Sequence, residues 1–284
     1  MLRGDLVSAK IADIVEYSAQ KGSWLIAQRS KAQRKKTGQF MTPSLVARFM
    51  ADRLGPIRDG DRILDPGIGS GALACAVVQR IIERHEASEV WIDGFEVDEA
   101  LCRMATDALT RASEEALAHG IRVHVRVKHG DFIVERAHAG KQLRMFGARQ
   151  DPRTIVYDHV IANPPYFKLN SSDPRVRLVS DRIGGVTNIY TVFMALSLEA
   201  LADLGRACFI IPRSFCSGAY FAGFRSAFLE KANLLSFHLF ESRTKTFKRE
   251  AVLQENIIVT FQRKDRQGVL GRNEYVRIST SSGG

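Results

Sequence analysis

Four consecutive residues, Asn163-Pro164-Pro165-Tyr166, combine groups that can activate an aromatic amine. Neither proline has a backbone N–H, and the pair prevents a helix from starting, so nearby carbonyls stay free to point into a crevice. If Asn163 Oδ1 and the Pro164 carbonyl each accept one hydrogen of an amine such as adenine N6, the nitrogen lone pair can attack a methyl donor. Tyr166 offers a ring face for a base, which must be flipped out of a duplex to reach it. By itself the segment is also compatible with a rigid proline turn and a core tyrosine.

A glycine-rich segment, DPGIGSG at residues 65–71, lies between a short apolar run and a helical pattern. Its glycines Gly67, Gly69 and Gly71 allow a ligand to touch backbone at the carboxyl end of a strand, where open α/β sheets bind ligands. The spacing is G-x-G-x-G and not the G-x-G-x-x-G of dinucleotide sites, which favours a cofactor without phosphates. S-adenosylmethionine meets this requirement, and its ammonium group can face Asp65. The alternative is a tight turn that only packs a helix on a strand.

Acidic residues also follow the next two predicted strands. Glu96, next to Val97 in the second strand end, can accept hydrogen bonds from both hydroxyls of a ribose. Asp98 is better placed to cap the following helix. After the third strand, Asp131 offers a carboxylate for the amino group of an adenine and Phe132 offers a ring for its face. These positions are informative because they are in register with the glycine segment, whereas each acid alone is not.

Along the chain, short apolar runs alternate with amphipathic stretches of helical period, which predicts an α/β fold with a largely parallel sheet. Strands are expected at residues 62–65, 90–96, 121–128, 154–162, 207–211, 234–240 and 256–262. Helices are expected at residues 72–85, 98–119, 189–204 and 219–230, and after Pro43, which suits a helix start. The prediction is a Rossmann-like methyltransferase fold with a mostly parallel seven-stranded sheet flanked by helices.

We divide the chain into three predicted parts. They are a basic helical N-terminal extension (1–36), a catalytic domain (37–263), and a C-terminal tail or start of a further region (264–284). The length of 284 residues, with 45% hydrophobic and 25% charged residues, fits one main domain of a globular protein. No apolar run suits a membrane span or a signal peptide, so a cytoplasmic protein is expected.

The net charge of +10 suggests a polyanionic partner such as nucleic acid. The cations cluster at residues 31–36, 245–249 and 263–266, although a basic run can equally be a solvated face. Metal-ligand spacing is lacking among the cysteines, so no metal is predicted and we expect reduced core thiols at Cys75, Cys102, Cys208 and Cys216.

In their order along the chain, the GQFMTP segment (38–43), the glycine segment, the strand-end acids and NPPY resemble the gamma-type DNA adenine-N6 methyltransferases of the Eco57I-like restriction-modification family. The resemblance covers roughly residues 37–263. It implies that Thr42 and Asp65 hold the methionine end of S-adenosylmethionine. It further implies that Glu96 binds the ribose and Asp131 the adenine of this cofactor.

Two aromatic residues gain roles from the same resemblance. Phe193 would pack on the cofactor adenine, and Phe247 would stack against the flipped base, although a phenylalanine before a strand is equally a core residue. The implied activity is adenine-N6 methylation of double-stranded DNA by a bacterial, DNA-associated protein. One mild departure is Gly67-Ile68 after the proline, where many relatives have Ala-Cys; the backbone geometry remains compatible.

Most members of that family carry a target-recognition region after the catalytic domain, whereas only residues 264–284 follow the resembling region here. Specificity would then come from a partner specificity subunit, a C-terminal recognition domain, the basic N-terminal helix or residues 134–152. A cognate restriction endonuclease is a further expected partner. Residues 168–187 are either a loop over the substrate or a connector.

Three alternative functions remain open. They are a protein-glutamine methyltransferase of release factors, an RNA adenine-N6 methyltransferase, and a DNA-binding subunit with an inactive methyltransferase fold. The Thr42-Pro43 pair argues against the first, and the presence of every predicted reacting residue argues against the last.

Overall fold

The computed structural model describes residues 13–30, 33, 38, 40–137, 155–180, 182–183, 185–241, 256–265 and 275–282. Within this part of the chain, eight strands form one sheet in the order β3-β2-β1-β4-β5-β7-β6-β8. The strands are β1 (Arg62–Asp65), β2 (Glu89–Glu96), β3 (Arg122–His129), β4 (Tyr157–Ala162), β5 (Leu201–Pro212), β6 (Ala232–Glu241), β7 (Asn256–Arg263) and β8 (Arg277–Ser282). Neighbouring strands are parallel except at β7, which is antiparallel to both β5 and β6.

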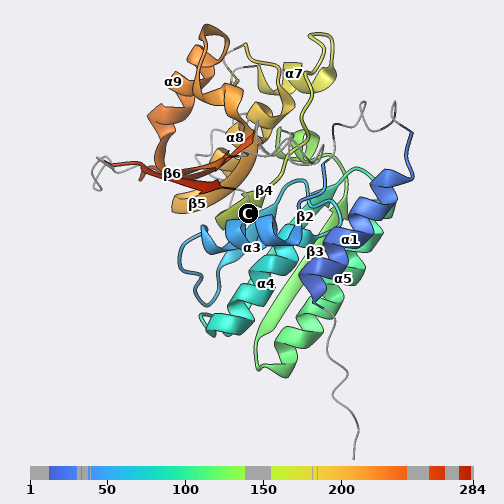
Figure 1. Cartoon of the computed structure of the whole chain (residues 1–284). Coiled ribbons are helices and arrows are strands. Elements are labelled where there is room, and N and C mark those ends of the chain that lie inside the picture. Colours follow the sequence, from blue (N-terminus) through green and yellow to red (C-terminus); the bar gives the residue numbers. More distant parts are fainter. Residues whose placement is uncertain are drawn as a thin grey trace, which may run out of the picture.

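Helices cover both faces of this sheet (Figure 1). One face carries α1 (Ile14–Ala27), α3 (Ser44–Asp52), α4 (Ala72–Arg84) and α5 (Glu99–Ala118), which share one hydrophobic cluster. The other face carries α8 (Ile189–Ala200) and α9 (Ala222–Lys231), which share a second cluster. Connections contain α7 (Pro174–Val179) and the short 3₁₀ helices η1 (Arg213–Cys216) and η2 (Ala219–Phe221).

Strand β5 shows why the sheet lies between two helical layers. Phe209 and Ile211 belong to the cluster under α8 and α9, whereas Cys208 and Ile210 belong to the cluster under α3 and α4. Successive side chains of a strand point to opposite faces, so a run that is apolar throughout needs cover on both. The apolar run of β5 is therefore covered on both of its faces.

The seven predicted strands are all present, but the count of seven is wrong because β8 adds an eighth. This strand lies in the segment 264–284, whose end was expected to be a tail, and it pairs in parallel with β6 along the sheet edge. Its serines explain the missed signal: Ser279 and Ser281 hydroxyls lie 2.9 and 3.1 Å from the two ring nitrogens of His238 on β6. A strand that is attached through backbone pairing and polar side chains has no apolar pattern.

Two local expectations also need correction. The helix predicted to reach residue 204 ends at Ala200, and β5 follows at once; Leu204 within β5 has a φ of 65°, which a helix cannot contain. Cys216, expected to be a core thiol, is exposed in η1, whereas Cys75, Cys102 and Cys208 are buried.

The described part of the predicted N-terminal extension, α1, packs directly on the main domain. Ile14 and Val15 are buried in the same cluster as α4 and α5, and Asp13 caps the helix by accepting from the N–H groups of Val15 and Glu16 (3.1 Å each). None of the described helices combines the length and apolar composition that a bilayer crossing needs.

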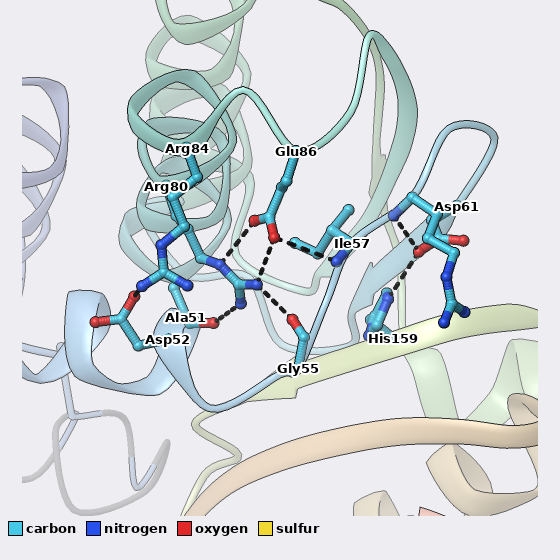
Figure 2. Close-up of polar contacts among 10 residues, drawn as sticks. Ala51, Asp52, Gly55, Ile57, Asp61, Arg80, Arg84, Glu86 and His159 are labelled. Atoms are coloured by element: carbon cyan, nitrogen blue, oxygen red, sulfur yellow. Dashed lines mark hydrogen bonds and ion pairs between the residues drawn. The ribbon is translucent and has the colours of Figure 1, made fainter.

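A buried arginine joins α3, α4 and the segment before β1, away from the glycine loop at the other end of α4 (Figure 2). The side chain of Arg80 is 4% exposed, and its Nε lies 2.8 Å from Glu86 Oε1. The guanidinium also donates to the carbonyl of Ala51, in the last turn of α3, and to that of Gly55, which follows the helix. This network satisfies backbone carbonyls at the end of α3 and attaches the segment before β1 to α4.

Candidate functional site

The glycine loop connects β1 to α4 and is attached to the end of β2. Gly69 (φ 56°) and Gly71 (φ 93°) adopt left-handed backbone conformations that favour glycine. The Gly69 N–H donates to Glu96 Oε2 (3.0 Å), and the Ile68 N–H donates to the Phe95 carbonyl (3.0 Å). The loop therefore lies against the strand end that carries Glu96.

Glu96 is nearly buried at the carboxyl end of β2. Besides Gly69, the Asp98 N–H donates to this carboxylate, at 2.9 Å from Oε1. Burial raises the pKa of Glu96, partly opposed by these backbone N–H groups. The Asp98 side chain accepts from the Leu101 N–H (3.1 Å) at the start of α5, which confirms its predicted capping role.

Asp131 follows β3 and contacts both its own loop and α7. Its Oδ1 accepts from the Ile133 N–H (2.8 Å), and its Oδ2 lies 3.4 Å from Nη1 of Arg175. Arg175 is held from the other side by Asp173, at 2.7 Å between Nη2 and Oδ2. The stretch 168–187 therefore reaches the site through α7. Its sequence indicated a possible loop but not this arginine, because a polar segment without period does not single out one residue.

A cavity of about 420 Å³ lies at these strand ends, within the range of small-molecule sites. It is found next to the point between β1 and β4 where the strand order reverses, as expected for an open α/β sheet. Rings form part of its wall, since Phe132 contacts both Phe95 (5.5 Å between centroids) and Phe193 (5.6 Å). The predicted residues that line the cavity are Thr42, Gly67, Gly69, Glu96, Val97, Asp131, Phe132, Asn163, Pro165 and Phe193.

Four predicted site residues are outside the cavity wall: Asp65, Gly71, Pro164 and Tyr166. Asp65 is fully buried below the glycine loop, where its Oδ1 accepts from the Gly67 N–H (3.3 Å). Its Oδ2 has no hydrogen-bond partner among the described residues. Phe247 lies outside the described residues, so its predicted role stays a prediction.

Asp65 leads to a testable pH dependence of stability. Burial raises the pKa of this carboxyl from 3.8 to about 8, and the charge of Glu96 adds to the shift. The folded protein therefore binds a proton between pH 4 and pH 8 that the unfolded chain releases, so this stabilisation is complete below the lower pKa and is lost as pH rises towards the higher. In urea unfolding, wild type should lose stability relative to Asp65→Asn between pH 5 and pH 8. Parallel curves for the two proteins would contradict the assignment.

The amide of Asn163 has a defined orientation at the end of β4. Its Nδ2 donates to the Phe40 carbonyl (2.8 Å) and to Thr42 Oγ1 (3.0 Å), which uses both amide hydrogens. Its Oδ1 accepts from the Tyr166 hydroxyl (2.9 Å). An amide oxygen has two lone pairs, so one remains for a further donor. Asn163, a residue of the cavity wall, can thus accept a further hydrogen bond but has no amide hydrogen left to donate.

Tyr166 supports this arrangement from behind. Its hydroxyl also lies 2.9 Å from the Ile210 carbonyl on β5, and burial raises its pKa above the usual range, so it stays protonated and donates. Phe40 stacks on the Tyr166 ring at 5.6 Å between centroids, while remaining partly exposed. Phe40 therefore occupies one face of the Tyr166 ring.

Further residues of the cavity were not predicted individually, among them Phe40, Met41, Ile68, Ser70, Phe167 and Arg175. Phe40 and Met41 belong to the GQFMTP segment, so the motif itself carried a usable signal. Apolar residues such as Ile68 and Phe167 carried none, because only the packing of distant elements decides which of them face a cavity.

Of the three basic clusters, the one at residues 31–36 lies mostly, and the one at residues 245–249 wholly, outside the described residues. The third is structural in its described part. Arg263 Nη1 donates to the Leu201 carbonyl (2.6 Å) after α8, and Lys264 Nζ donates to the Leu229 carbonyl (2.6 Å) near the end of α9. Cations at helix C-termini satisfy free carbonyls. β7 begins beside Pro212, at the carboxyl end of β5, and ends at Arg263. Arg263 and Lys264 therefore lie at the opposite ends of the strands from the cavity.

Known proteins are similar in sequence to this chain over most of its length. A family model described as N-6 DNA Methylase matches residues 21–269. The Type II methyltransferase M.BsuBI of Bacillus subtilis is 33% identical over 254 residues, which cover 88% of this chain and 47% of the relative. The Type II methyltransferase M.PstI of Providencia stuartii is 31% identical over 235 residues, covering 82% and 44%. The chain spans about half the length of these curated relatives.

Solved structures match the fold at low sequence identity. The methyltransferase subunit of a type I restriction-modification system from Streptococcus thermophilus is 20% identical, has a TM-score of 0.57, and covers 80% of this chain and 45% of its own. The fold is thus the α/β fold of class I S-adenosylmethionine-dependent methyltransferases. With a family model that matches most of its residues, this chain belongs to the N-6 DNA methylase family.

Proposed function

We propose that this chain carries the catalytic site of a DNA methyltransferase that transfers a methyl group from S-adenosylmethionine to adenine N6 in double-stranded DNA. Within the family, we assign it to the gamma-type, Eco57I-like restriction-modification methylases. Membership of the N-6 DNA methylase family supports this assignment. The observation that carries it is the fixed amide of Asn163, a residue of the cavity wall whose Oδ1 can accept a further hydrogen bond.

The residues present fit S-adenosylmethionine. Gly67 and Gly69 leave backbone open to close approach, and Phe132 and Phe193 provide ring faces for an adenine. The Glu96 carboxylate, held by the N–H groups of Gly69 and Asp98, lines the cavity where a ribose hydroxyl could donate to it. A cationic ligand at the glycine loop would favour the charged form of the buried Asp65 carboxyl, whose Oδ2 lacks a hydrogen-bond partner among the described residues.

We propose roles in cofactor binding for five of the predicted residues. Thr42 and Asp65 would hold the methionine end, Glu96 the ribose, and Asp131 and Phe193 the adenine. When bound, S-adenosylmethionine supplies an electrophilic methyl group, so the reaction needs no covalent enzyme nucleophile. The protein contributes by positioning two reactants and by excluding water.

Asn163 would activate the target amine. Its free Oδ1 lone pair accepts one N6 hydrogen, and the Pro164 carbonyl accepts the other, which draws the N6 lone pair out of conjugation with the ring. The bonds from Asn163 Nδ2 to Phe40 and Thr42 prevent the amide from rotating. Thr42 thereby links the cofactor cavity to the amine site. Thr42 belongs to the GQFMTP segment, and the presence of this segment favours DNA as the substrate.

Double-stranded DNA would approach the carboxyl edge of the sheet. Three exposed basic residues lie in segments that follow β4 and β5 at this edge: Lys168, Arg177 and Arg213. Positive side chains around a base-flipping site neutralise phosphates on either side of the target. We further propose that a specificity subunit or a C-terminal recognition domain reads the target sequence, and that a cognate restriction endonuclease acts beside this protein in the bacterial cytoplasm.

The test offers several methyl acceptors to one protein. The chain is incubated with methyl-labelled S-adenosylmethionine and, separately, with unmethylated genomic DNA, structured RNA and a release factor, and the labelled product is digested and identified. We expect label on N6-methyladenine from DNA. Label only on RNA or on glutamine would replace the DNA assignment with one of these alternatives. Binding of DNA without transfer to any acceptor would favour the inactive subunit.

A further inference from the structure

Helix α1 contacts the glycine loop from behind, although it lies outside the motifs that define the cofactor site. The Ser18 hydroxyl donates to the Ser70 carbonyl at 2.5 Å, and Ser18 is 1% exposed. Ser70 is a wall residue of the cavity. A buried hydrogen bond therefore joins α1 to the backbone of the loop that would receive the cofactor.

One turn further along α1, Gly22 marks a close approach. A Cβ at this position would overlap the Ser70 hydroxyl and would lie 2.7 Å from Ser70 Cβ and 2.8 Å from Met41 Sδ. Gly22 is inside an α-helix, where glycine is intrinsically less favourable than alanine. Its backbone conformation does not require glycine, so the space taken by Ser70 and Met41 is the reason that fits. Both neighbours line the cavity.

The other end of α1 reaches the loop that carries the ribose acid. Arg29, two residues after the helix, forms an ion pair with Asp98. The Asp98 N–H donates to Glu96 Oε1 (2.9 Å), and its side chain caps α5. Arg29 thus holds the residue whose backbone orients Glu96. The two loops that shape the cofactor cavity are both attached to α1.

The helix itself is firmly placed. Val15 is fully buried against α4 and α5, and α3 contacts α1 through an ion pair between Arg48 and Asp13 (2.5 Å) and a hydrogen bond from Ser44 to Glu16. A helix anchored on three others can impose a geometry on the two loops that it contacts.

We propose that α1 is a component of the cofactor site, in which Gly22 and Ser18 set the position of the glycine loop and Arg29 sets the position of the Glu96 loop. This inference rests on the proposed function, because it takes S-adenosylmethionine as the ligand of the cavity. These three are positioning residues, since they act through Ser70, Met41 and Asp98.

The test measures binding of S-adenosylhomocysteine by titration calorimetry without any methyl acceptor. Gly22→Ala is expected to weaken binding about tenfold, because displacing Ser70 and Met41 would move the glycine loop by enough to lose on the order of one hydrogen bond to the ligand. Ser18→Ala and Arg29→Gln should each weaken it several-fold. Amide hydrogen exchange at Gly69, whose N–H donates to Glu96, should become faster in all three variants.

The same variants separate positioning from a purely structural role. If α1 only packs on the domain, the overlap of the new Cβ with Ser70 and Met41 in Gly22→Ala should lower the thermal midpoint and leave affinity below the unfolding transition unchanged, and this result would overturn the proposal. If α1 positions the loops, KM for S-adenosylmethionine rises while kcat changes less than about twofold. The matched control is Gln20→Ala, on the exposed side of the same helix, which should change neither quantity.

Failure of the proposed function gives a different pattern. Wild-type protein that binds no S-adenosylhomocysteine would remove the ligand assignment itself, and with it this inference. If wild type binds S-adenosylhomocysteine and all three variants bind it equally well, only the role of α1 is contradicted. The variants are Gly22→Ala, Ser18→Ala and Arg29→Gln.

Discussion

Replacing Asn163 with alanine is expected to reduce methyl transfer by about 10²- to 10³-fold, the usual cost of removing one hydrogen-bonding group that acts in the transition state. The substitution removes the Oδ1 acceptor that would align adenine N6, and the Tyr166 hydroxyl loses one of its two acceptors. The measurement is the single-turnover rate with unmethylated DNA at saturating S-adenosylmethionine. A variant that retains the wild-type rate would show that the amide has no part in the reaction.

The hydrogen bond from Asn163 to Thr42 makes a control for this experiment necessary. Because Asn163 Nδ2 bonds Thr42 in the cavity wall, alanine can disturb the cofactor site as well as the amine site. Asn163→Asp keeps an acceptor and is expected to retain more activity than alanine. Binding of S-adenosylhomocysteine should change less than about threefold in Asn163→Ala, which is under 1 kcal/mol. A loss of affinity as large as the loss of rate would place Asn163 in cofactor binding instead.

The largest effect on stability is expected at Arg80. Arg80→Ala leaves the Glu86 carboxylate without its ion pair and the Ala51 and Gly55 carbonyls without a donor (Figure 2). Removing one partner of a buried pair costs about 3 to 5 kcal/mol because the remaining charge stays buried. Urea unfolding followed by circular dichroism should show this loss of unfolding free energy.

Arg84, one turn further along α4, provides the matched control. Its ion pair with Asp52 is exposed, with side chains 47% and 51% accessible. Exposed pairs contribute up to about 1 kcal/mol, so Arg84→Ala should change stability little. Equal losses in the two variants would mean that burial of the Arg80 network does not matter. Neither variant touches the cavity, so cofactor affinity measured below the unfolding transition should be unchanged.

Most of the sheet could be predicted because its signals are local. The alternating strand β3 and a helix such as α5 produce periods of two and 3.6 residues that can be recognised without knowledge of their neighbours. The turn residues after β1 and the cap at Asp98 are local as well, and both lie where predicted. By contrast, β8 depends on pairing with β6 more than thirty positions earlier, and its polar residues give no such period.

The site was predictable to the extent that strand ends coincide in space. Glu96, Asp131 and Asn163 each follow a strand of a parallel sheet, so topology alone brings them to one edge. What topology does not give is side-chain depth: Asp65 follows the first of these strands, yet its carboxylate is buried below the loop and not in the cavity wall. Arg175 enters the wall from a segment without a recognisable pattern.

The sequence by itself determined the order of strands and helices, the strand-end chemistry and the resemblance to a methylase family, because each is encoded within a short stretch of residues. The tertiary structure decided which charges serve the site and which serve the scaffold. Arg263 and Lys264 belong to a basic run, yet their positions at helix C-termini give them a structural role. Helix α1 precedes every motif, yet Ser18 and Gly22 contact the glycine loop. Such roles depend on distances between segments far apart in the chain, which periodicity does not encode.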